Sequence, residues 1–311
     1  MGGIHLSKRI GIVGGGITGL ISAYFLSLEG HKVDLYEKKT LLSETSSKTT
    51  KLIHGGIRYL ENLQFHEVKN GINDRKWWLE NFPDETKLQE IIILSKRKFS
   101  SEILKFFVGI KIYETFAGRS NIKIGRLYKQ EDLLSFDIKN DIAAGISFFD
   151  GLMQESVGEE IIKRCKSNGV NFYENHEIKS IRSEGFIEER QYEKIIIATG
   201  PWISSFLKQN KIDTNKAIDY IKGSHLVIKR QIKNGLMFRD RKKQRYIFAL
   251  PYKGNLLLGT TEQRVSTPED KQVLDSEVNY LLESINIYID KPISKDEIIE
   301  SYAGVRPLIK S

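Results

Sequence analysis

Three glycines near the amino terminus restrict the possible folds more than any other part of the chain. Gly14, Gly16 and Gly19 form the pattern G-x-G-x-x-G, directly after a short apolar strand signal at residues 9–13. In this pattern the first glycine makes a tight turn, and the second lets the backbone approach a pyrophosphate. The third lets a helix pack closely on a strand. The pattern therefore predicts the start of a βαβ unit that binds a dinucleotide.

The residues that follow complete this unit. A helical pattern covers residues 20–28 and stops at Gly30, and a second apolar strand at 33–36 ends at Glu37. Glu37 follows Gly14 by 23 residues, the place from which an acid bonds ribose hydroxyls. The helix N-terminus favours the negative charge of a phosphate. The unit predicts a dinucleotide site, with a functionless glycine-rich turn as the alternative, and it does not distinguish NAD from FAD.

A second unusual stretch, SSKTTKLIHGGIRYLE, covers residues 46–61. It combines hydroxyls, a lysine, a histidine, a glycine pair and an arginine, a mixture that neither a core nor an ordinary surface requires. Glycines allow close approach of the backbone to another group. Histidine titrates near neutral pH, and the planar fork of arginine matches phosphate oxygens. We expect this stretch to belong to a site.

Together with the glycine pattern, this stretch resembles the FAD-dependent glycerol-3-phosphate dehydrogenase family. Five further segments agree with the family in the same order: KIYETFAG at 111–118, IIIATGPW at 195–202, KGSHLV at 222–227, FALPYKGNLLLGTTE at 248–262 and YAGVRPL at 302–308. The resemblance covers essentially the whole chain. The HGG-R-Y, GSH and GVRPL elements are specific in combination, although none is specific alone.

The resemblance implies an α/β fold with an α+β second domain. The first part is an FAD-binding, Rossmann-like domain of the FAD-dependent, D-amino-acid-oxidase-like oxidoreductase superfamily, and the second is a substrate domain with an antiparallel sheet. Both domains are expected to be discontinuous. The FAD-binding domain takes residues 1–75, 146–212 and 303–311, without its C-terminal part, and the substrate domain takes residues 76–145 and 213–302.

Local patterns agree with this division. Helices are expected at 159–167, 275–285 and 102–116, a buried strand at 194–198, and several strands between 217 and 261 with a turn at KGN. Residues 298–305 lead Arg306 back toward the site.

The implied reaction is oxidation of sn-glycerol 3-phosphate to dihydroxyacetone phosphate, with hydride transfer to FAD and electrons passed to a quinone or another acceptor. Two alternatives remain: a related FAD-dependent oxidoreductase acting on another hydroxy acid or an amine, and a truncated flavin-binding fragment without activity. An NAD enzyme is weaker, because nothing after Glu37 looks like a nicotinamide site.

Alcohol oxidation requires a base for the hydroxyl proton and positive charge for the phosphate. Arg58 and Arg306 are the candidates for the phosphate, and His54 and His225 are the candidates for the base, which the sequence does not rank. The glycine pattern and the resemblance give the following cofactor-binding residues: Gly14, Gly16, Gly19, Glu37, Ser46, Ser47, Lys51, Leu52, His54, Gly55, Gly56, Thr199 and Gly200.

Composition limits the possible partners. The formal net charge is +8, but the basic residues are scattered and are not interleaved with aromatic residues, so no nucleic-acid partner is expected. Cys165 is the single cysteine, which excludes an internal disulfide and fits a reducing, cytoplasmic compartment. No His or Cys spacing predicts a metal site. The partner that the resemblance implies is a small-molecule substrate, glycerol 3-phosphate.

Membrane contact is a separate question. No apolar run is long enough to span a membrane. The segment 96–118 mixes lysines with Phe, Ile and Val, which is typical either of a helix on a membrane surface or of a buried substrate-domain helix with basic flanks. The buried helix is the favoured interpretation, and peripheral contact on the cytoplasmic face, with a membrane quinone as acceptor, is the alternative.

The sequence departs from the family in two places. Asp150 and Gly151 are kept, but residues 154–157 replace the acidic-Ala-Arg element that follows in the family, which is expected to alter a helix start or a flavin contact. The chain also stops three residues after Leu308, where the family continues through a Gly-Gly-Lys turn and a helical domain. We expect a truncated or split product, or a second chain that completes the site.

Overall fold

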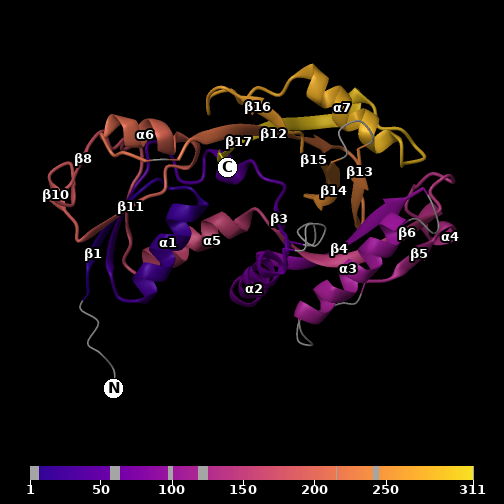
Figure 1. Ribbon diagram of the computed structural model, residues 1–311, viewed down its shortest axis with the longest axis horizontal. Helices are drawn as coiled ribbons and strands as arrows, with labels where there is room; N and C mark the ends of the chain where they lie inside the picture. Colours follow the sequence, from indigo (N-terminus) through magenta and orange to yellow (C-terminus); the bar gives the residue numbers. More distant parts are fainter. Residues whose placement is uncertain are drawn as a thin grey trace.

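The computed structural model describes residues 7–56, 64–96, 101–117, 125–214, 216–240 and 245–310. The chain forms two main sheets that follow one another along the long axis of the molecule (Figure 1). The sheet that contains the first strand of the βαβ unit lies toward one end. Arg58, a candidate for phosphate binding, lies outside the described residues.

The first layer is a parallel sheet with the strand order β11-β1-β2-β7. Its strands are β1 (Arg9–Val13), β2 (Lys32–Tyr36), β7 (Asn171–Tyr173) and β11 (Lys194–Ile197). The helix α1 (Ile17–Leu28) connects β1 to β2, and α5 (Ser156–Ser167) packs beside it (Figure 1). Their shared core includes Ile12, Leu20, Leu35, Ile161 and Cys165, each fully buried.

The other side of this sheet is covered by a small antiparallel sheet and a short helix. They are β8 (Ile181–Arg182), β9 (Phe186–Ile187), β10 (Arg190–Gln191) and α6 (Ile203–Gln209). Ile187, Tyr192 and Phe206 pack there against Val13 and Tyr36 of the parallel sheet. Both faces of the parallel strands are therefore covered, as such sheets require.

The second layer is a ten-stranded sheet within the described residues, with the order β16-β12-β15-β14-β13-β4-β6-β3; β17 also pairs with β12, and β5 with β6. The strands are β3 (Leu52–Ile53), β4 (Thr86–Ser95), β5 (Leu127–Lys129), β6 (Ala144–Met153), β12 (Ile218–Ile228), β13 (Gly235–Arg239), β14 (Tyr246–Tyr252), β15 (Asn255–Gly259), β16 (Gln263–Val265) and β17 (Ile298–Ile309). Apart from the β13–β4 pair, the described ladders of this sheet are antiparallel.

Helices cover both faces of the large sheet. The helices α2 (Phe65–Asn81) and α3 (Ser101–Ala117) lie on one face, whereas α4 (Gln130–Leu134) and α7 (Asp275–Asn286) lie on the other (Figure 1). The strand β4 shows why. Ile91 and Ile93 pack into the core under α2 and α3, and Ile92 and Leu94 pack into the core under α7, because successive side chains of a strand point to opposite faces.

The local expectations for strands and helices are confirmed within one to three residues at most ends. Residues 154–157 do bear on a helix start: α5 begins at Ser156 without a side-chain cap, and the Glu155 carboxylate is held by Lys253 and Tyr252 instead. The strands β6 and β17 both pair within the large sheet, and the division into two discontinuous domains remains a prediction.

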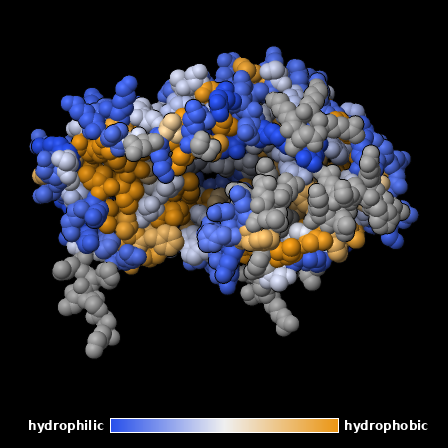
Figure 2. Space-filling view, in the orientation of Figure 1, coloured by the Kyte–Doolittle hydropathy of each residue, from blue (hydrophilic) through white to orange (hydrophobic). Residues whose placement is uncertain are grey.

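The surface gives two further observations. Figure 2 shows an apolar area on the half of the molecule that holds the parallel sheet, and Phe25 and Leu28 of α1 are among the exposed large apolar side chains. Within the described ranges, no helix combines the length and the apolar character needed to cross a membrane.

Candidate cofactor and substrate site

A cavity of about 410 Å³ lies at the carboxyl ends of the parallel strands. Its wall is formed by the turn after β1, the end of β2, residues 44–46 and the turn after β11. Residues Glu269 and Lys271, which follow β16 of the large sheet, close another side. A crevice at the carboxyl ends of parallel strands is where open α/β sheets bind nucleotides.

The three glycines of the motif are needed for their predicted geometric roles. Gly14 has φ +112°, and a Cβ there would lie 2.3 Å from the carbonyl oxygen of Ala198. A Cβ on Gly19 would lie 1.9 Å from the carbonyl oxygen of Gly14, so helix and turn touch. Side chains at these positions would break the turn that shapes the cavity.

The N-terminus of α1 points at this cavity and is shared with another segment. The backbone N–H of Ile17 donates to Oγ of Ser46 at 2.9 Å. Ser46 belongs to a short 3-10 helix, Thr45–Ser47, and Gly16 leaves room for its hydroxyl, since a Cβ would lie 3.1 Å away. Backbone donors and a hydroxyl thus meet where a pyrophosphate would bind.

Glu37 has a fixed carboxylate at the end of β2. Its Oε2 accepts from the backbone N–H of Gly15 at 2.7 Å, and its Oε1 accepts from the backbone N–H of Lys39 at 2.8 Å. A carboxylate has about four acceptor positions, so two remain for hydroxyl groups of a ligand. The orientation agrees with the predicted role toward a ribose.

Thr199 gives a direct test of whether a polar ligand fits. Its Oγ1 is buried and has no hydrogen-bond partner among the described residues, although the residue lines the cavity. Gly200, which follows, has φ +55°, and a Cβ there would have no other atom within 4 Å. An unsatisfied buried hydroxyl is costly, and a ligand with acceptor groups in this cavity would satisfy it.

A polar bridge crosses the mouth of the cavity. Nζ of Lys271 donates to the Glu44 carboxylate, which also accepts from Lys39, and Nε1 of Trp202 donates to Glu269 at 2.6 Å. Burial acts to raise the pKa of Glu44, but the hydrogen bonds from the two lysines outweigh it and the pKa is lowered. The loop after β16 is thereby tied to the nucleotide-binding half.

The described part of the HGG stretch, residues 46–56 of SSKTTKLIHGGIRYLE, reaches the edge of the large sheet at β3. Leu52 and Ile53 form β3, and Lys51 before them has φ +61° with Nζ donating to the carbonyl oxygen of Ser47 at 2.6 Å. Burial lowers the pKa of this lysine. After β3 the chain exposes His54, while Gly55 and the next glycine are buried.

His225 lies at the crossing of β12 with β17 and with the segment before β3. It is 3% exposed, its Nε2 is 2.9 Å from Oγ1 of Thr50, and its ring stacks on Tyr302. On the other side, a Cβ on Gly259 would lie 2.3 Å from the ring. Burial, followed by the charges of Arg306 and Lys51, lowers the pKa of His225 to about 3, so the imidazole is neutral.

Arg306 completes this group. It is exposed on β17, opposite Ile221 of β12. A Cβ on Gly223 would lie 2.8 Å from its Nη2 and 2.4 Å from Oγ1 of Thr260. The guanidinium therefore occupies the space that a side chain at Gly223 would fill. Its positive charge helps to lower the pKa of His225.

The predicted residues thus fall into two groups. The cavity is lined by Gly14, Gly16, Glu37, Ser46, Thr199 and Gly200. Gly19 packs against the carbonyl of Gly14 without lining the cavity. Outside the lining as well are Ser47, Lys51, Leu52, His54, Gly55 and Gly56. The structure brings His225 together with Arg306 and Lys51. No group of side chains suited to a metal ion occurs within the described parts of the chain.

Sequence reasoning missed the side chains that join separate segments. Thr50 holds His225, and Lys271 and Glu269 close the cavity. Thr50 stands inside the HGG stretch, so its position was a usable signal. Lys271 lies in an ordinary polar loop, and nothing in its surroundings in the sequence indicates a site.

Comparison with known proteins places this fold and site in a family. The family model DAO, FAD dependent oxidoreductase, matches residues 9–311. The chain belongs to the FAD-dependent oxidoreductase family, which confirms the predicted fold class, and FAD is the cofactor that this class of enzyme uses. The cavity, with its glycine turn, helix N-terminus and Glu37, fits that cofactor.

The relatives with similar sequences carry more specific names than the family model does. The chain is 30% identical to the aerobic glycerol-3-phosphate dehydrogenase of Staphylococcus haemolyticus, over 96% of this chain and 58% of the relative. It is 28% identical to the glycerol-3-phosphate dehydrogenase of Pseudomonas tolaasii, over 96% of this chain and 61% of the relative. The chain thus spans about three fifths of the length of these curated relatives.

Solved structures share the fold. The L-alpha-glycerophosphate oxidase of Mycoplasma pneumoniae, with FAD bound, has a TM-score of 0.78 at 19% identity, covering 98% of this chain and 84% of that one. The glycerol-3-phosphate dehydrogenase of Bacillus halodurans, complexed with FAD, has a TM-score of 0.73 at 21% identity, covering 98% and 58%.

Proposed function

We propose that this chain oxidises sn-glycerol 3-phosphate to dihydroxyacetone phosphate. The observation that carries the proposal is the positive group at the β12–β17 ladder, where Arg306 and Lys51 lie beside a neutral, buried His225. Such a group favours an anionic substrate, and an arginine fork matches a phosphate. The names of the relatives support the same substrate.

The cofactor would be held by groups already described. The N-terminus of α1 and Ser46 would hold the pyrophosphate, and Glu37 would hold a ribose. FAD, when bound, accepts a hydride. Lys51 and the buried glycine pair at 55–56 would lie along the ring system, where the absence of side chains permits close contact.

In this proposal His54 is the base that accepts the hydroxyl proton of the substrate. The carbon-bound hydrogen of the alcohol leaves as hydride, and the hydroxyl proton must go to a base. His54 is exposed, whereas His225 is buried and has a pKa of about 3. We therefore place the base at His54 and give His225 a structural role through Thr50 and Tyr302. Arg306, with Arg58 from outside the described residues, would hold the phosphate.

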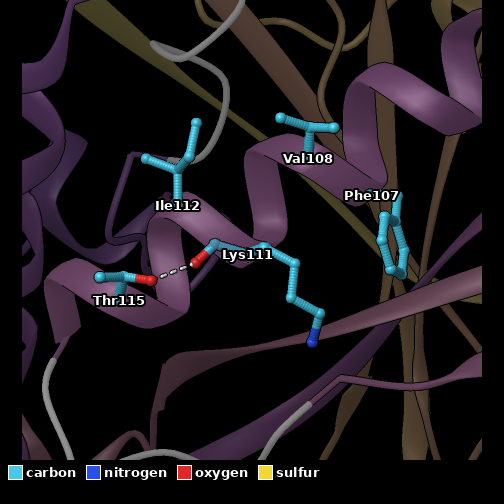
Figure 3. A pocket seen from close by; sticks show the side chains of 5 residues that line it. All are labelled: Phe107, Val108, Lys111, Ile112 and Thr115. Carbon is cyan, nitrogen blue, oxygen red and sulfur yellow. Dashed lines mark hydrogen bonds between the residues drawn. The ribbon is translucent and has the colours of Figure 1, made fainter.

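The electron acceptor and the cell compartment belong to the same proposal. We place the chain in the cytoplasm, with a quinone as acceptor and α3 as the element that contacts a membrane surface. Figure 3 shows that Phe107, Val108 and Ile112 project from one stretch of α3 together with Lys111, and these residues line a surface pocket of about 410 Å³.

The test is a visible absorption spectrum of the purified chain, followed by anaerobic addition of glycerol 3-phosphate. A flavin spectrum that bleaches supports the proposal, and inorganic phosphate should slow the bleaching by competing for the arginines. A flavin spectrum that persists contradicts the substrate assignment, and the same sample should then be tested with hydroxy acids and amines. A chain that takes up no FAD would contradict the activity altogether.

A further inference from the structure

A buried cluster of three polar side chains lies close enough to the exposed His54 to interact with it electrostatically. Asp150 of β6 and Arg75 of α2 are 1% and 3% exposed, and Tyr113 of α3 is 2% exposed. Nη1 of Arg75 donates to the Tyr113 hydroxyl at 2.6 Å and to Oδ1 of Asp150 at 3.1 Å, and the hydroxyl donates to the same Oδ1 at 2.9 Å. Three elements are thereby joined at one oxygen atom.

The same oxygen holds the HGG stretch. The β3–β6 ladder ends at the pair Ile53 and Gly151. Beyond it, the backbone N–H of Gly55 donates to Oδ1 of Asp150 at 2.8 Å. A side-chain carboxylate thus takes the place of the next backbone acceptor, and the chain turns away from the sheet at His54, which becomes exposed.

Gly55 is also fixed by contact on two sides. A Cβ at this position would lie 1.9 Å from the Tyr113 hydroxyl oxygen. On the α2 side, a Cβ on Gly71 would lie 3.0 Å from the carbonyl carbon of Gly55. The backbone therefore lies between α2 and α3 without room to shift. A turn that only connects two elements at the surface would not need such close packing around its backbone.

The charges in the cluster argue against a purely stabilising role. Burial raises the pKa of Asp150 although Arg75 acts to lower it, and Oδ2 of Asp150 is buried without a partner among the described residues. Buried ion pairs are often no more stabilising than apolar residues of similar volume. The hydrogen bonds that meet at Oδ1 instead fix the relative positions of β6, α2 and α3.

We propose that Asp150, Arg75 and Tyr113 are positioning residues that hold residues 54–56 in place against the cofactor and thereby orient the His54 imidazole. The orientation of His54 rests on the proposed function, whereas the anchoring of the backbone does not. The three residues act through Gly55 and touch neither substrate nor reacting atoms in this assignment.

The test uses Asp150→Asn, which keeps the shape and removes the charge, and Tyr113→Phe, which removes one hydroxyl. The matched control is Asp34→Asn, because Asp34 is also buried and accepts from an arginine and a tyrosine, Arg9 and Tyr192, but lies in the parallel sheet. Amide hydrogen exchange of the peptide containing residues 52–56 is measured without cofactor. The visible spectrum of bound FAD, kcat and KM are measured on the holoenzyme.

We expect Asp150→Asn to speed exchange in this peptide about tenfold, since a hydrogen bond to a charged acceptor is weakened. The flavin band should shift, and kcat should fall about tenfold with KM within about threefold. Tyr113→Phe should move the same quantities in the same direction by a smaller factor, and Asp34→Asn should move none of them.

The proposal is overturned if Asp150→Asn behaves like Asp34→Asn, losing thermal stability alone. It is equally overturned if exchange accelerates while the flavin band and kcat stay unchanged, because the cluster would then anchor the loop without positioning anything. If Asp150→Asn does not fold, Tyr113→Phe decides by the same measurements. If the wild-type chain is not reduced by glycerol 3-phosphate, the proposed function fails, and exchange and the flavin band still decide the positioning of the loop.

Discussion

The imidazole of His225 stacks on the phenol ring of Tyr302, with ring centroids 5.1 Å apart and planes 26° from parallel. The two residues are also paired in the ladder between β12 and β17. The Tyr302 hydroxyl donates to the carbonyl oxygen of Thr49 at 3.0 Å, and the next residue, Thr50, contacts His225. The β12–β17 ladder is therefore attached to residues 49–50 of the HGG stretch.

The burial of His225 predicts a specific pH dependence of stability. Its pKa in the folded chain, about 3, lies below the ordinary value of 6.5. Between these values the unfolded chain binds a proton that the folded chain does not, so this contribution to stability is complete above pH 6.5. It is lost as the pH falls toward 3, with a slope of up to about 1.4 kcal/mol per pH unit.

Urea unfolding of the wild type and of His225→Gln between pH 7 and pH 4 would measure this slope. The variant should be less stable at pH 7 but should lose less stability per pH unit. Parallel curves for the two proteins would show that another group is responsible.

Gly19→Ala should weaken FAD binding, because its Cβ would lie 1.9 Å from the carbonyl oxygen of Gly14. Overpacking of this kind costs about 1–3 kcal/mol, which corresponds to about a ten- to hundredfold weaker Kd if the strain falls on the cofactor turn. Flavin fluorescence titration gives the Kd. Gly30→Ala is the control, since Gly30 has φ +81° but nothing within 4 Å of a Cβ; equal effects of the two would refute the argument.

Lys271→Ala should release FAD faster, by about three- to tenfold at low salt, because it removes the bridge to Glu44 across the cavity mouth. The difference from wild type should shrink as salt is raised, since screening weakens the pair that remains in the wild type. Stopped-flow fluorescence gives the off-rate. The exposed Lys295→Ala should have no effect, and a salt-independent difference would contradict the electrostatic explanation.

Arg306→Lys should lower kcat/KM for glycerol 3-phosphate about tenfold or more, because lysine keeps the charge but loses the two-pronged donor geometry. The control is Arg264→Lys, an exposed arginine on β16 paired with Asp219. Steady-state kinetics on both variants decide. Unchanged kinetics in Arg306→Lys would remove this residue from the substrate site.

His54→Asn should reduce kcat by about 10²-fold or more while leaving FAD bound, as expected for loss of a general base. Rapid-reaction measurement of flavin reduction separates this step from later electron transfer. A larger loss of reduction rate in His225→Gln, with FAD still bound, would reverse the assignment of the two histidines.

The parts of this molecule that the sequence predicted are local. The turn at Gly14, the helix after it and Glu37 lie within one βαβ unit, whose geometry follows from residues close together in the chain. The same holds for the ends of α7 and β11. Short-range patterns of glycines, charges and apolar residues are sufficient there.

The missed parts depend on contacts between distant segments. Thr50 and His225 are separated by 175 residues, and Glu44 and Lys271 by 227 residues. Arg75 and Asp150 are separated by 75 residues and look like ordinary polar residues of a helix and a strand. The pairing of β6 and β17 within the large sheet was equally hidden, because an alternating strand pattern does not identify its partner.

The mixed origin of the cavity wall has a consequence for how the molecule resists heat. Glu269 and Lys271 follow a strand of the large sheet, whereas Gly14, Glu37 and Thr199 follow strands of the parallel sheet. A ligand bound in this cavity contacts both the parallel-sheet part and the large-sheet part of the molecule, so these two parts cannot separate unless the ligand is released. The melting temperature of both halves should therefore rise together with FAD concentration, as mass action requires for a ligand that binds only the folded chain.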